Sequence, residues 1–443
     1  MFFLILIGLG LALQQSTCAQ PANQLQLSQP GKEAPPPRVL TLQEAMELAR
    51  INSPQLASAN ITALLAHEDR VQAKAALLPN ANWFNQFIYT QPNGTPSGVF
   101  VANDGPHVYN NWAIVHGDIF APGKRAEFQR ATVAEAVARA KADIAGRGLI
   151  ATVVQNYYSL VSAQRKYANA QQSLREAVQF NDITQKQEQG GEVAHSDVVK
   201  AQIQLAQRQR DAQEAQLAIE KARIGFAVIL FPDFRRDYSV VDDLQTTPPL
   251  PSFEQIQGLA GKNNPDVRAA QGTVRQETLG ITIARSAYLP TLSFDYFLGI
   301  DANQYALYNR SHLNNLGSVA QAQMTIPLWT WGATRSKVRQ AELHLQQAKT
   351  DLSLTQRQLL ANLNSFYQEA ETARSQLASL KSSLDLSTES LRLTLLRYTA
   401  GEVTVLEVVD AQTTLVQARN AYDDGVVRYR LALANLQTLT GAF

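Results

Sequence analysis

The chain has 443 residues, a net charge of +1 and 17% charged residues. Its length allows two or three ordinary domains, and its near-neutral charge excludes the strongly basic or acidic classes that bind nucleic acid or acidic substrates. The single cysteine, Cys18, excludes a disulfide framework and a cysteine metal site, and the six histidines are scattered without metal-ligand spacing.

Residues 1–19 predict a signal peptide. Residues 1–13 are almost wholly apolar, and this run is too short to span a bilayer as a helix. The small residues around Cys18 would allow cleavage before Gln20. The alternative is that Cys18 is lipidated, although the three residues before it match that processing signal poorly.

No later stretch reaches about 18 consecutive apolar residues. We therefore expect no transmembrane helix in the mature chain. Backbone polar groups in lipid must all be paired, so a mature chain that spans a membrane would do so as a β-barrel.

An extended arm and a first helix come next. Residues 20–40 are polar and contain three consecutive prolines, which indicates an extended N-terminal arm. Thr41 should start a helix, because Glu44 three residues later completes a capping box. This helix should run to Leu78, with a break or kink at Pro54.

A β-hairpin is predicted at 81–120. Aromatic and β-branched residues at both ends of this segment indicate two strands, and turn residues fill 91–106 between them. Each strand would have about 10 residues, the length that a tilted membrane-spanning strand needs.

A very long helical hairpin is predicted at 124–231. Residues 124–189 contain no proline, and a single helix of that length would extend about 100 Å. The glycine pair at 190–191 should break it, and a second helix should follow with Ser196 as its N-cap. These elements complete a first structural repeat at 41–231.

The second half of the chain, 252–443, repeats this plan after an irregular connector at 232–251. The expected elements are a helix, a β-hairpin at 291–329 and a coiled-coil hairpin at 332–440. Three motifs recur at a nearly constant offset: Asn52-Ser53-Pro54 returns as Asn263-Asn264-Pro265, Leu78-Pro79 as Leu289-Pro290, and Gly191-Glu192-Val193 as Gly401-Glu402-Val403. Because the unit is far longer than a solenoid repeat of about 20–50 residues, the chain is a duplicated half-protein.

Heptad spacing characterises the second coiled-coil hairpin. Core-type residues in its first helix follow alternating steps of four and three: Leu359, Leu363, Phe366, Ala370, Ala373, Leu377, Leu380, Leu384, Ser387 and Leu391. The returning helix has the same spacing at Val408, Ala411, Leu415, Ala418 and Tyr422. This period of about 3.5 residues predicts an antiparallel coiled coil.

Two β-hairpins give one chain only four strands, whereas bacterial membrane barrels have at least eight. Open strand edges are not tolerated in lipid, so subunits must pool their strands. Two chains would supply eight and three would supply twelve, and a wide pore favours three. Aromatic residues near the expected strand ends are candidates for membrane-interface girdles, with packing beneath the barrel as the alternative: Trp83, Phe84, Trp112, Trp329 and Trp331.

This combination resembles the TolC-like outer-membrane efflux family, the exit ducts of tripartite drug pumps and type I secretion systems. The resemblance covers about 40–441. It rests on the Asn-Ser-Pro and Leu-Pro motifs of each half, the strand exit into Pro-Gly or Trp-Gly, and the duplicated Gly-Glu-Val followed by Val-Val-x-Ala-Gln. It implies a mainly α fold with very long antiparallel coiled-coil helices in a trimeric tunnel. Four strands per subunit would enter a shared twelve-stranded transmembrane barrel, and the connector at 232–251 would join a belt around the tunnel.

The resemblance also implies a function. Three copies would form a duct in the outer membrane of a Gram-negative bacterium, with a long periplasmic portion, that passes drugs, other toxic small molecules or protein. Its partners would be a periplasmic adaptor (membrane fusion) protein, an inner-membrane pump and outer-membrane lipid. We find no catalytic constellation or phosphate loop and expect neither enzyme activity nor a cofactor. The alternative is a periplasmic or surface coiled-coil scaffold without channel activity.

Two acidic residues match the family's positions at the narrowest periplasmic opening. Glu407 and Asp410 would form two stacked carboxylate rings in a trimer, which would attract cations. The alternative is that both are ordinary acids near a helix N-terminus, where the helix dipole favours them.

Three further residues match positions that latch neighbouring hairpins together. Ser196, Asp197 and Tyr398 would form this latch, with a hydrogen bond between Asp197 and Tyr398. Alternatively, Asp197 is a helix N-terminal acid and Tyr398 is a core residue on the heptad.

The hairpin tips match the region where the family's periplasmic adaptor docks. The candidate docking residues are Gly190, Gly191, Glu192, Val193, Gly401, Glu402 and Val403. The alternative is that these glycine-containing turns are purely structural.

Overall fold

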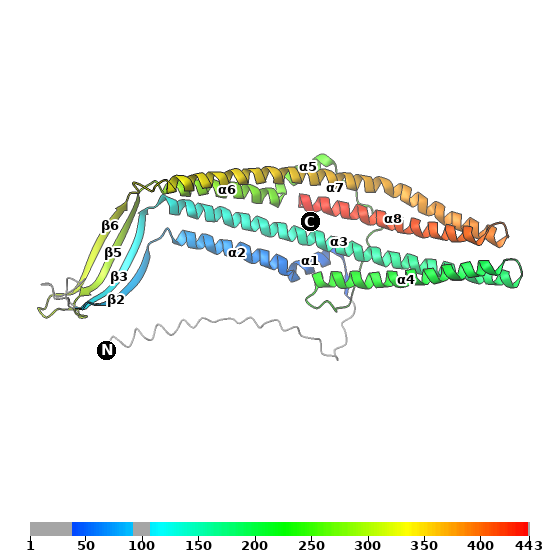
Figure 1. Ribbon diagram of the computed structural model, residues 1–443, viewed down its shortest axis with the longest axis horizontal. Coiled ribbons are helices and arrows are strands. Elements are labelled where there is room, and N and C mark those ends of the chain that lie inside the picture. Colours follow the sequence, from blue (N-terminus) through cyan, green and yellow to red (C-terminus); the bar gives the residue numbers. More distant parts are fainter. Residues whose placement is uncertain (1–37, 92–106, 442–443) are drawn as a thin grey trace.

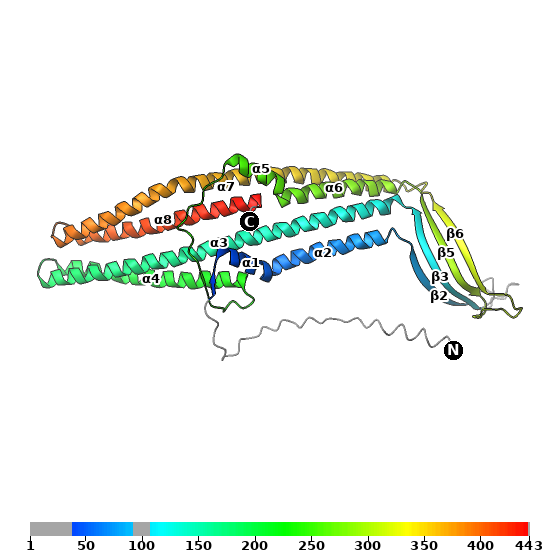
Figure 2. The same cartoon turned by 180° about the vertical axis from the view of Figure 1, so that it is seen from behind.

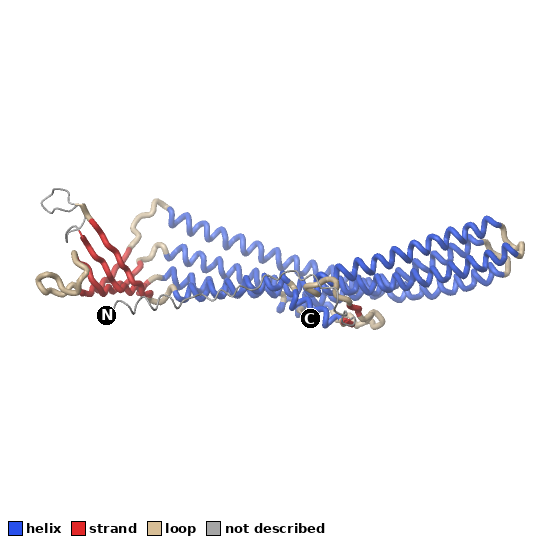
Figure 3. Tube along the Cα trace, turned by 90° about the horizontal axis from the view of Figure 1, so that it is seen from below, coloured by secondary structure: helices blue, strands red, loops and turns tan. Residues whose placement is uncertain are grey.

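The computed structural model describes residues 38–91 and 107–441. The predicted signal peptide, Cys18 and most of the predicted N-terminal arm lie outside the described residues. The described chain forms one elongated body, with four long strands at one end and the turns of two helical hairpins at the other (Figures 1 and 3).

Two matching series of elements follow each other along the chain. The first consists of α1 (Leu42–Asn52), α2 (Pro54–Ala75), β2 (Asn80–Tyr89), β3 (His107–Phe120), α3 (Pro122–Gln189) and α4 (His195–Leu230). The second consists of α5 (Phe253–Asn263), α6 (Pro265–Ser286), β5 (Thr291–Ala302), β6 (Leu316–Thr325), α7 (Ala333–Thr399) and α8 (Val405–Thr440). Corresponding helices have 11 and 11, 22 and 22, 68 and 67, and 36 and 36 residues. The duplication of motifs therefore extends to the order and length of the elements.

An Asn-Ser-Pro motif in the first series and an Asn-Asn-Pro motif in the second each separate two helices. Ser53 caps α2, with its Oγ accepting from the N–H of Leu56 at 3.3 Å. Asn264 caps α6 in the same way, with its Oδ1 accepting from the N–H of Val267 at 3.1 Å. A proline follows each cap at the first helical position, where its missing N–H costs nothing. The predicted break at Pro54 is confirmed, and so is the predicted capping box at the start of α1.

The four long strands form one antiparallel sheet in the order β2-β3-β5-β6 (Figure 2). β3 and β5, one from each series, pair in its centre. Within the described residues, β2 and β6 each pair along one edge only. The return strand predicted to reach Trp329 is shorter than expected: β6 ends at Thr325, because Pro327 has no N–H to donate to a ladder.

The aromatic residues expected near strand ends are placed differently. Trp329 and Trp331 lie between β6 and α7, beyond the end of the strand. Trp83 and Phe84 lie inside β2, and Trp112 lies near the middle of β3. The prediction of strand-end positions was therefore wrong for Phe84 and Trp112, because β2 begins at Asn80 and β3 at His107, several residues before them.

The coiled-coil period of α7 and α8 is confirmed by burial. Buried residues of α7 recur at heptad intervals, as in the pairs Leu363 and Ala370, Ala373 and Ser387, and Leu391 and Tyr398. Small residues let the two helices approach closely: a Cβ added at Gly425 would lie 2.5 Å from Cδ1 of Leu380. In the part of the chain that the structure describes, no helix is both long enough and apolar enough to span a membrane.

A buried cluster in the middle of the molecule joins α1, α3, α4 and α8. It includes Ala49, Val153, Phe226 and Val426. Two short parallel strands, β1 (Arg38–Leu40) and β4 (Tyr238–Val240), pair beside this cluster and tie the chain before α1 to the connector after α4. The sequence predicts an extended arm and an irregular connector but not this pairing, because three-residue strands have no period to recognise.

Replacing Asn264 by alanine should lower the stability of the protein, because α6 would lose the side-chain acceptor at its N-terminus. We expect a loss of about 1 kcal/mol in the free energy of unfolding. It would be measured as a lower midpoint in a circular dichroism melt of the full chain in detergent. Ser252→Ala is the matched control, since Ser252 is the N-cap of α5 without a side-chain hydrogen bond. Equal losses in both variants would contradict the capping role.

Candidate functional site

The two hairpin turns lie side by side at the end of the molecule opposite the strands (Figures 1 and 2). Gly191 and Gly401 have φ values of +75° and +79°, which favour glycine over any residue with a Cβ. The N–H of the residue after each glycine donates to a carbonyl in the last helical turn, at 2.8 and 2.9 Å. The predicted breaks are confirmed, and the candidate docking residues at 190–193 and 401–403 all lie in or next to these turns.

The two returning helices start differently. α4 begins at His195 after Ala194, which makes no side-chain cap. Ser196 therefore lies inside the first turn of α4, and its predicted role as N-cap is wrong. α8 follows Thr404, which forms a capping box with Glu407. The sequence did not distinguish these starts, because a serine one position inside a helix resembles a cap.

The candidate gate acids lie on the exposed side of α8, at the start of the helix. Glu407 and Asp410 are three residues apart, so their side chains share one face. Glu407 accepts a hydrogen bond from the N–H of Thr404 at 3.4 Å between N and Oε1, which is the helix-terminal role. Among the described residues, the side chain of Asp410 has no hydrogen bond or ion pair. The two carboxylates are thus presented together towards whatever faces α8 in an assembly.

The candidate latch residues are brought near one another, but not in the expected bond. Tyr398 is 3% exposed and packs edge-on against Phe180, with ring centroids 5.2 Å apart. Its hydroxyl donates to Oγ1 of Thr184 at 3.4 Å, while Asp197 accepts from Nζ of Lys200 at 3.1 Å. Burial and the charge of nearby Asp197 raise the pKa of Tyr398. The contact between α3 and α7 therefore exists in one chain with Thr184 as its acceptor, and the Asp197–Tyr398 bond stays a prediction.

Polar side chains also join the two hairpins further from the tips. Nη2 of Arg419 on α8 donates to Oε1 of Glu176 on α3 at 2.9 Å. Nη2 of Arg208 on α4 donates to Oγ1 of Thr413 on α8 at 3.1 Å. Neither contact is predicted from the sequence, because the partners are more than two hundred residues apart. The only sequence signal for the Arg419 contact is that Arg419 lies off the heptad seam of α8.

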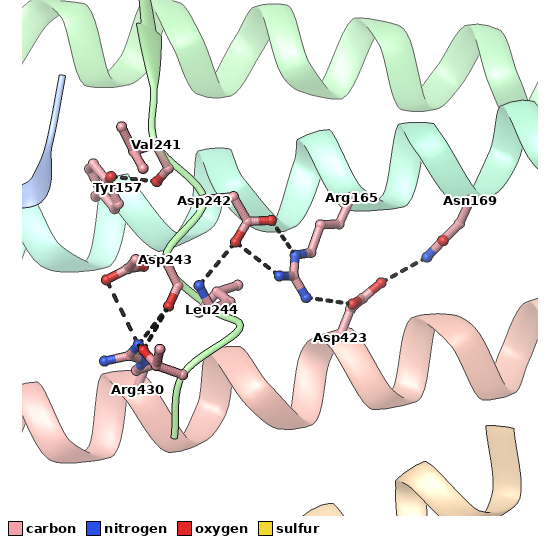
Figure 4. A network of polar contacts seen from close by, with 10 residues as sticks. Tyr157, Arg165, Asn169, Val241, Asp242, Asp243, Leu244, Asp423 and Arg430 are labelled. Atoms are coloured by element: carbon pink, nitrogen blue, oxygen red, sulfur yellow. Dashed lines mark hydrogen bonds and ion pairs between the residues drawn. The ribbon is translucent and has the colours of Figure 1, made fainter. Parts of the chain in front are cut away.

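A polar network attaches the connector to α3 and α8 (Figure 4). Arg165 on α3 binds Asp242 through two donors, Nε at 2.6 Å and Nη2 at 2.9 Å, and its Nη1 donates to Asp423 of α8 at 3.0 Å. Asn169, one turn further along α3, donates to the other oxygen of Asp423 at 2.8 Å. Arg430 of α8 donates to the backbone oxygen of Asp243 at 2.7 Å. One guanidinium thus joins three separate segments of the chain.

Burial and these contacts shift the pKa values of Asp242 and Tyr157. Burial by itself would raise the pKa of Asp242, but the hydrogen bonds from Arg165 and the N–H of Leu244 outweigh it and lower the pKa. Burial raises the pKa of Tyr157 to about 12, and its hydroxyl donates to the backbone oxygen of Val241 at 2.6 Å. Within 38–91 and 107–441, no group of three or more His, Cys, Asp or Glu is placed to hold a metal ion.

Comparison with known proteins gives consistent matches. Residues 257–442 match the family model described as outer membrane efflux protein. The chain is 22% identical over 422 residues to the alkaline protease secretion protein AprF of Pseudomonas aeruginosa, covering 91% of this chain and 84% of that protein. It is 22% identical over 409 residues to the outer membrane protein TolC of Vibrio cholerae, covering 90% of each. The fold matches the crystal structure of the outer membrane protein VceC of Vibrio cholerae with a TM-score of 0.81, at 18% identity and coverage of 90% of this chain and 96% of that one.

Replacing Arg165 by methionine should destabilise the middle of the molecule, because Asp242 and Asp423 would lose the cation that both of them bind. We expect a loss of about 2 kcal/mol in the free energy of unfolding at neutral pH, measured by chemical denaturation. Arg223→Met is the matched control, since its ion pair with Asp237 is exposed and should contribute at most about 1 kcal/mol. Comparable losses in the two variants would argue against a special role for Arg165.

The ion pair between Arg165 and Asp242 also predicts how the stability of the protein depends on pH. The pKa of Asp242 is lowered in the folded chain, so the stability that it contributes is present above the ordinary aspartate pKa of about 3.9. That contribution is lost as the pH falls through the lower, folded-state value. Arg165→Met should therefore lose less stability than the unchanged protein on acidification below about pH 4. If the stabilities of Arg165→Met and of the unchanged protein fell in parallel below about pH 4, the role of Arg165 in lowering the pKa of Asp242 would be contradicted.

Proposed function

We propose that three copies of this chain form the exit duct of a tripartite efflux or type I secretion system. The match of residues 257–442 to the outer membrane efflux protein family model and the similarity to TolC and VceC of Vibrio cholerae support this proposal. In it, the chain is an outer-membrane efflux channel with a long periplasmic part. The duct passes small molecules or protein from the periplasm to the exterior. Its partners are a periplasmic adaptor and an inner-membrane pump.

The four-stranded sheet with two open edges carries this proposal. Its strands have 10 to 14 residues, as long as tilted strands that cross a bilayer. Three copies, pairing β6 of one chain with β2 of the next, close a twelve-stranded barrel without an exposed edge. In a bilayer this closure satisfies every backbone group of the sheet.

The helices supply the rest of the duct. A helix as long as α3, with 68 residues, extends about 100 Å at 1.5 Å per residue. The two structural repeats, 41–231 and 252–443, contribute equivalent walls to a helical tunnel. The connector at 232–251 forms the belt around it, which is consistent with its attachment through Arg165 to α3 and α8.

The tips form the periplasmic gate in this proposal. Three copies each of Glu407 and Asp410 form the acidic rings, which is consistent with their shared exposed face on α8. The latch consists of Ser196, Asp197 and Tyr398. The Tyr398–Thr184 contact holds the two hairpins of one chain together, and Asp197 becomes a partner when hairpins meet between chains.

The adaptor docks on the turns. The residues that it contacts are those at 190–193 and 401–403, which are arranged as two similar turns side by side. Two equivalent turns on each of three chains give six docking positions around the tunnel end, so an adaptor could bind them in a repeated arrangement.

Asp410→Ala tests both the duct and its gate. We expect the purified protein in a planar bilayer to give small, cation-selective current steps. The variant should lose cation preference by about fivefold or more, because one carboxylate about 4 Å from a cation contributes about 1 kcal/mol in water.

The outcomes separate the two claims. Asp385→Ala is the control, since Asp385 is an exposed acid of α7 that pairs with Lys381 along the helix. Equal effects of Asp385→Ala and Asp410→Ala would remove the gate assignment and keep the channel. Folded protein that inserts into the bilayer and never conducts, even with its tips forced apart by urea, would contradict the duct itself.

A further inference from the structure

The two faces of the β2-β3-β5-β6 sheet differ in polarity. Cross-strand pairing puts mainly polar residues on one face, including Asn82, Gln86, His116, Asp118, Asp295 and Gln321. The opposite face carries mainly apolar residues, including Trp83, Phe87, Val115, Phe294, Tyr296 and Leu298. In the proposed barrel the apolar face contacts lipid, and the polar face lines the lumen.

An aromatic cluster of Phe84, Trp112 and Phe297 interrupts the polar face. Phe84 on β2 is paired directly with Trp112 on β3, with ring centroids 5.6 Å apart. Trp112 meets Phe297 on β5 edge-on, with ring centroids 5.8 Å apart. Polar residues lie on both sides of this cluster along the strands, including Asp295 on one side and Gln86 on the other. Three aromatic rings from three strands therefore stand together on this face, beside the aliphatic residues Ile114 and Val319, which are paired with Phe297 across the strands.

Two glycines lie beside this aromatic cluster. Gly299 and Gly317 lie in the same cross-strand row as Trp112. A Cβ at Gly299 would lie 2.0 Å from the backbone oxygen of Asn111, so a larger residue does not fit there. A Cβ at Gly317 would meet nothing within 4 Å. Glycine inside a strand weakens a sheet, yet two adjacent strands carry one here, next to the indole.

The chemistry of the cluster indicates what it contacts. Aromatic faces carry negative electrostatic potential and attract cations, and aromatic rings also pack against one another. Asp295 lies two residues from Phe297 on the same face and accepts from Nδ1 of His116 at 2.7 Å. Rings and a carboxylate on one wall suit a ligand that is both flat and positively charged.

We propose that the aromatic cluster of Phe84, Trp112 and Phe297 is a binding site for planar aromatic cations that pass through the barrel. This inference rests on the proposed duct and names the class of cargo that its outer part contacts. An acidic peptide would be repelled by the carboxylate of Asp295, and a bare metal ion has no flat apolar surface to pack on the rings. In three copies the cluster forms a ring of such sites around the lumen.

The first test determines which face of the sheet contacts lipid and which contacts water. Single-tryptophan proteins are made from the full chain, whose four tryptophans are at 83, 112, 329 and 331, by replacing the other three with phenylalanine. In vesicles of brominated lipid, fluorescence of Trp83 should be quenched by the lipid. Fluorescence of Trp112 should be quenched by acrylamide in the water and not by the lipid.

The outcomes of this test separate the two proposals. If brominated lipid quenches neither tryptophan, the sheet is not in the bilayer, and the proposed duct fails together with this inference. If brominated lipid quenches Trp112 as well as Trp83, the membrane location stands and the lumen site alone is overturned.

The second test measures binding, with ethidium as the planar aromatic cation and the full protein in lipid nanodiscs. Phe297→Leu should weaken the Kd of ethidium about two- to tenfold, because an aromatic contact contributes about 0.5–1.5 kcal/mol. Phe294→Leu, on the same strand and the opposite face, should leave the Kd unchanged. Phe84→Leu provides a second variant in case Phe297→Leu does not fold.

The contribution of the Asp295 charge is tested in the same titration with ethidium. Asp295→Asn should also weaken ethidium binding, since asparagine keeps the acceptor for His116 and removes the charge. Equal Kd values for Phe297→Leu, Phe84→Leu and the unchanged protein would overturn the proposal. So would equal weakening by Phe294→Leu and Phe297→Leu, because binding would then be to lipid or to the outer face.

Discussion

In the described residues, β2 and β6 have no strand partner along their outer edges, and these unpaired backbone groups are the constraint on which the rest of the structure depends. A strand edge offers a row of N–H and C=O groups that lipid cannot satisfy. Because β3 and β5 pair in the centre, one chain already joins its two repeats into one sheet, and only its outer edges remain to be paired. In the proposed assembly, further copies close the sheet into a barrel, and this closure fixes how the helices attached to the strands are arranged.

Contacts within each helical hairpin differ from contacts between the hairpins. Within the second hairpin, a heptad seam of apolar and small residues packs α7 against α8. Between the hairpins, the contacts near the tips and middle include Tyr398 with Thr184, Arg419 with Glu176, and Arg165 with Asp423. Apolar packing accompanies these polar contacts, since Phe180 and Ala201 of the first hairpin share a buried cluster with Leu391 and Val405 of the second. Separating the hairpins would therefore expose apolar area as well as break polar bonds.

The sequence predicted those features that have a period or a local motif. Heptad steps located the seam of α7, and the proline after Ser53 located the break between α1 and α2, because these signals act within a few residues. The equivalent break at Pro265 was not predicted, since a single helix was expected between 252 and the second β-hairpin. The β1–β4 pair, the Thr184 partner of Tyr398 and the three-way contact of Arg165 were missed. Each of these joins segments far apart in the chain, and side-chain type alone does not specify such a partner. The position of Phe84 and Trp112 in mid-strand also required the register of the sheet.

The most direct measurement is covalent cross-linking of the two outer strands in the assembled protein. Asn85→Cys on β2 and Ser318→Cys on β6 lie on the apolar face of the sheet. A short thiol cross-linker should join β6 of one chain to β2 of the next. The account predicts a ladder on denaturing gels that ends at three chains. Cross-linking that closes within one chain or at two chains, or that continues beyond three, would contradict it.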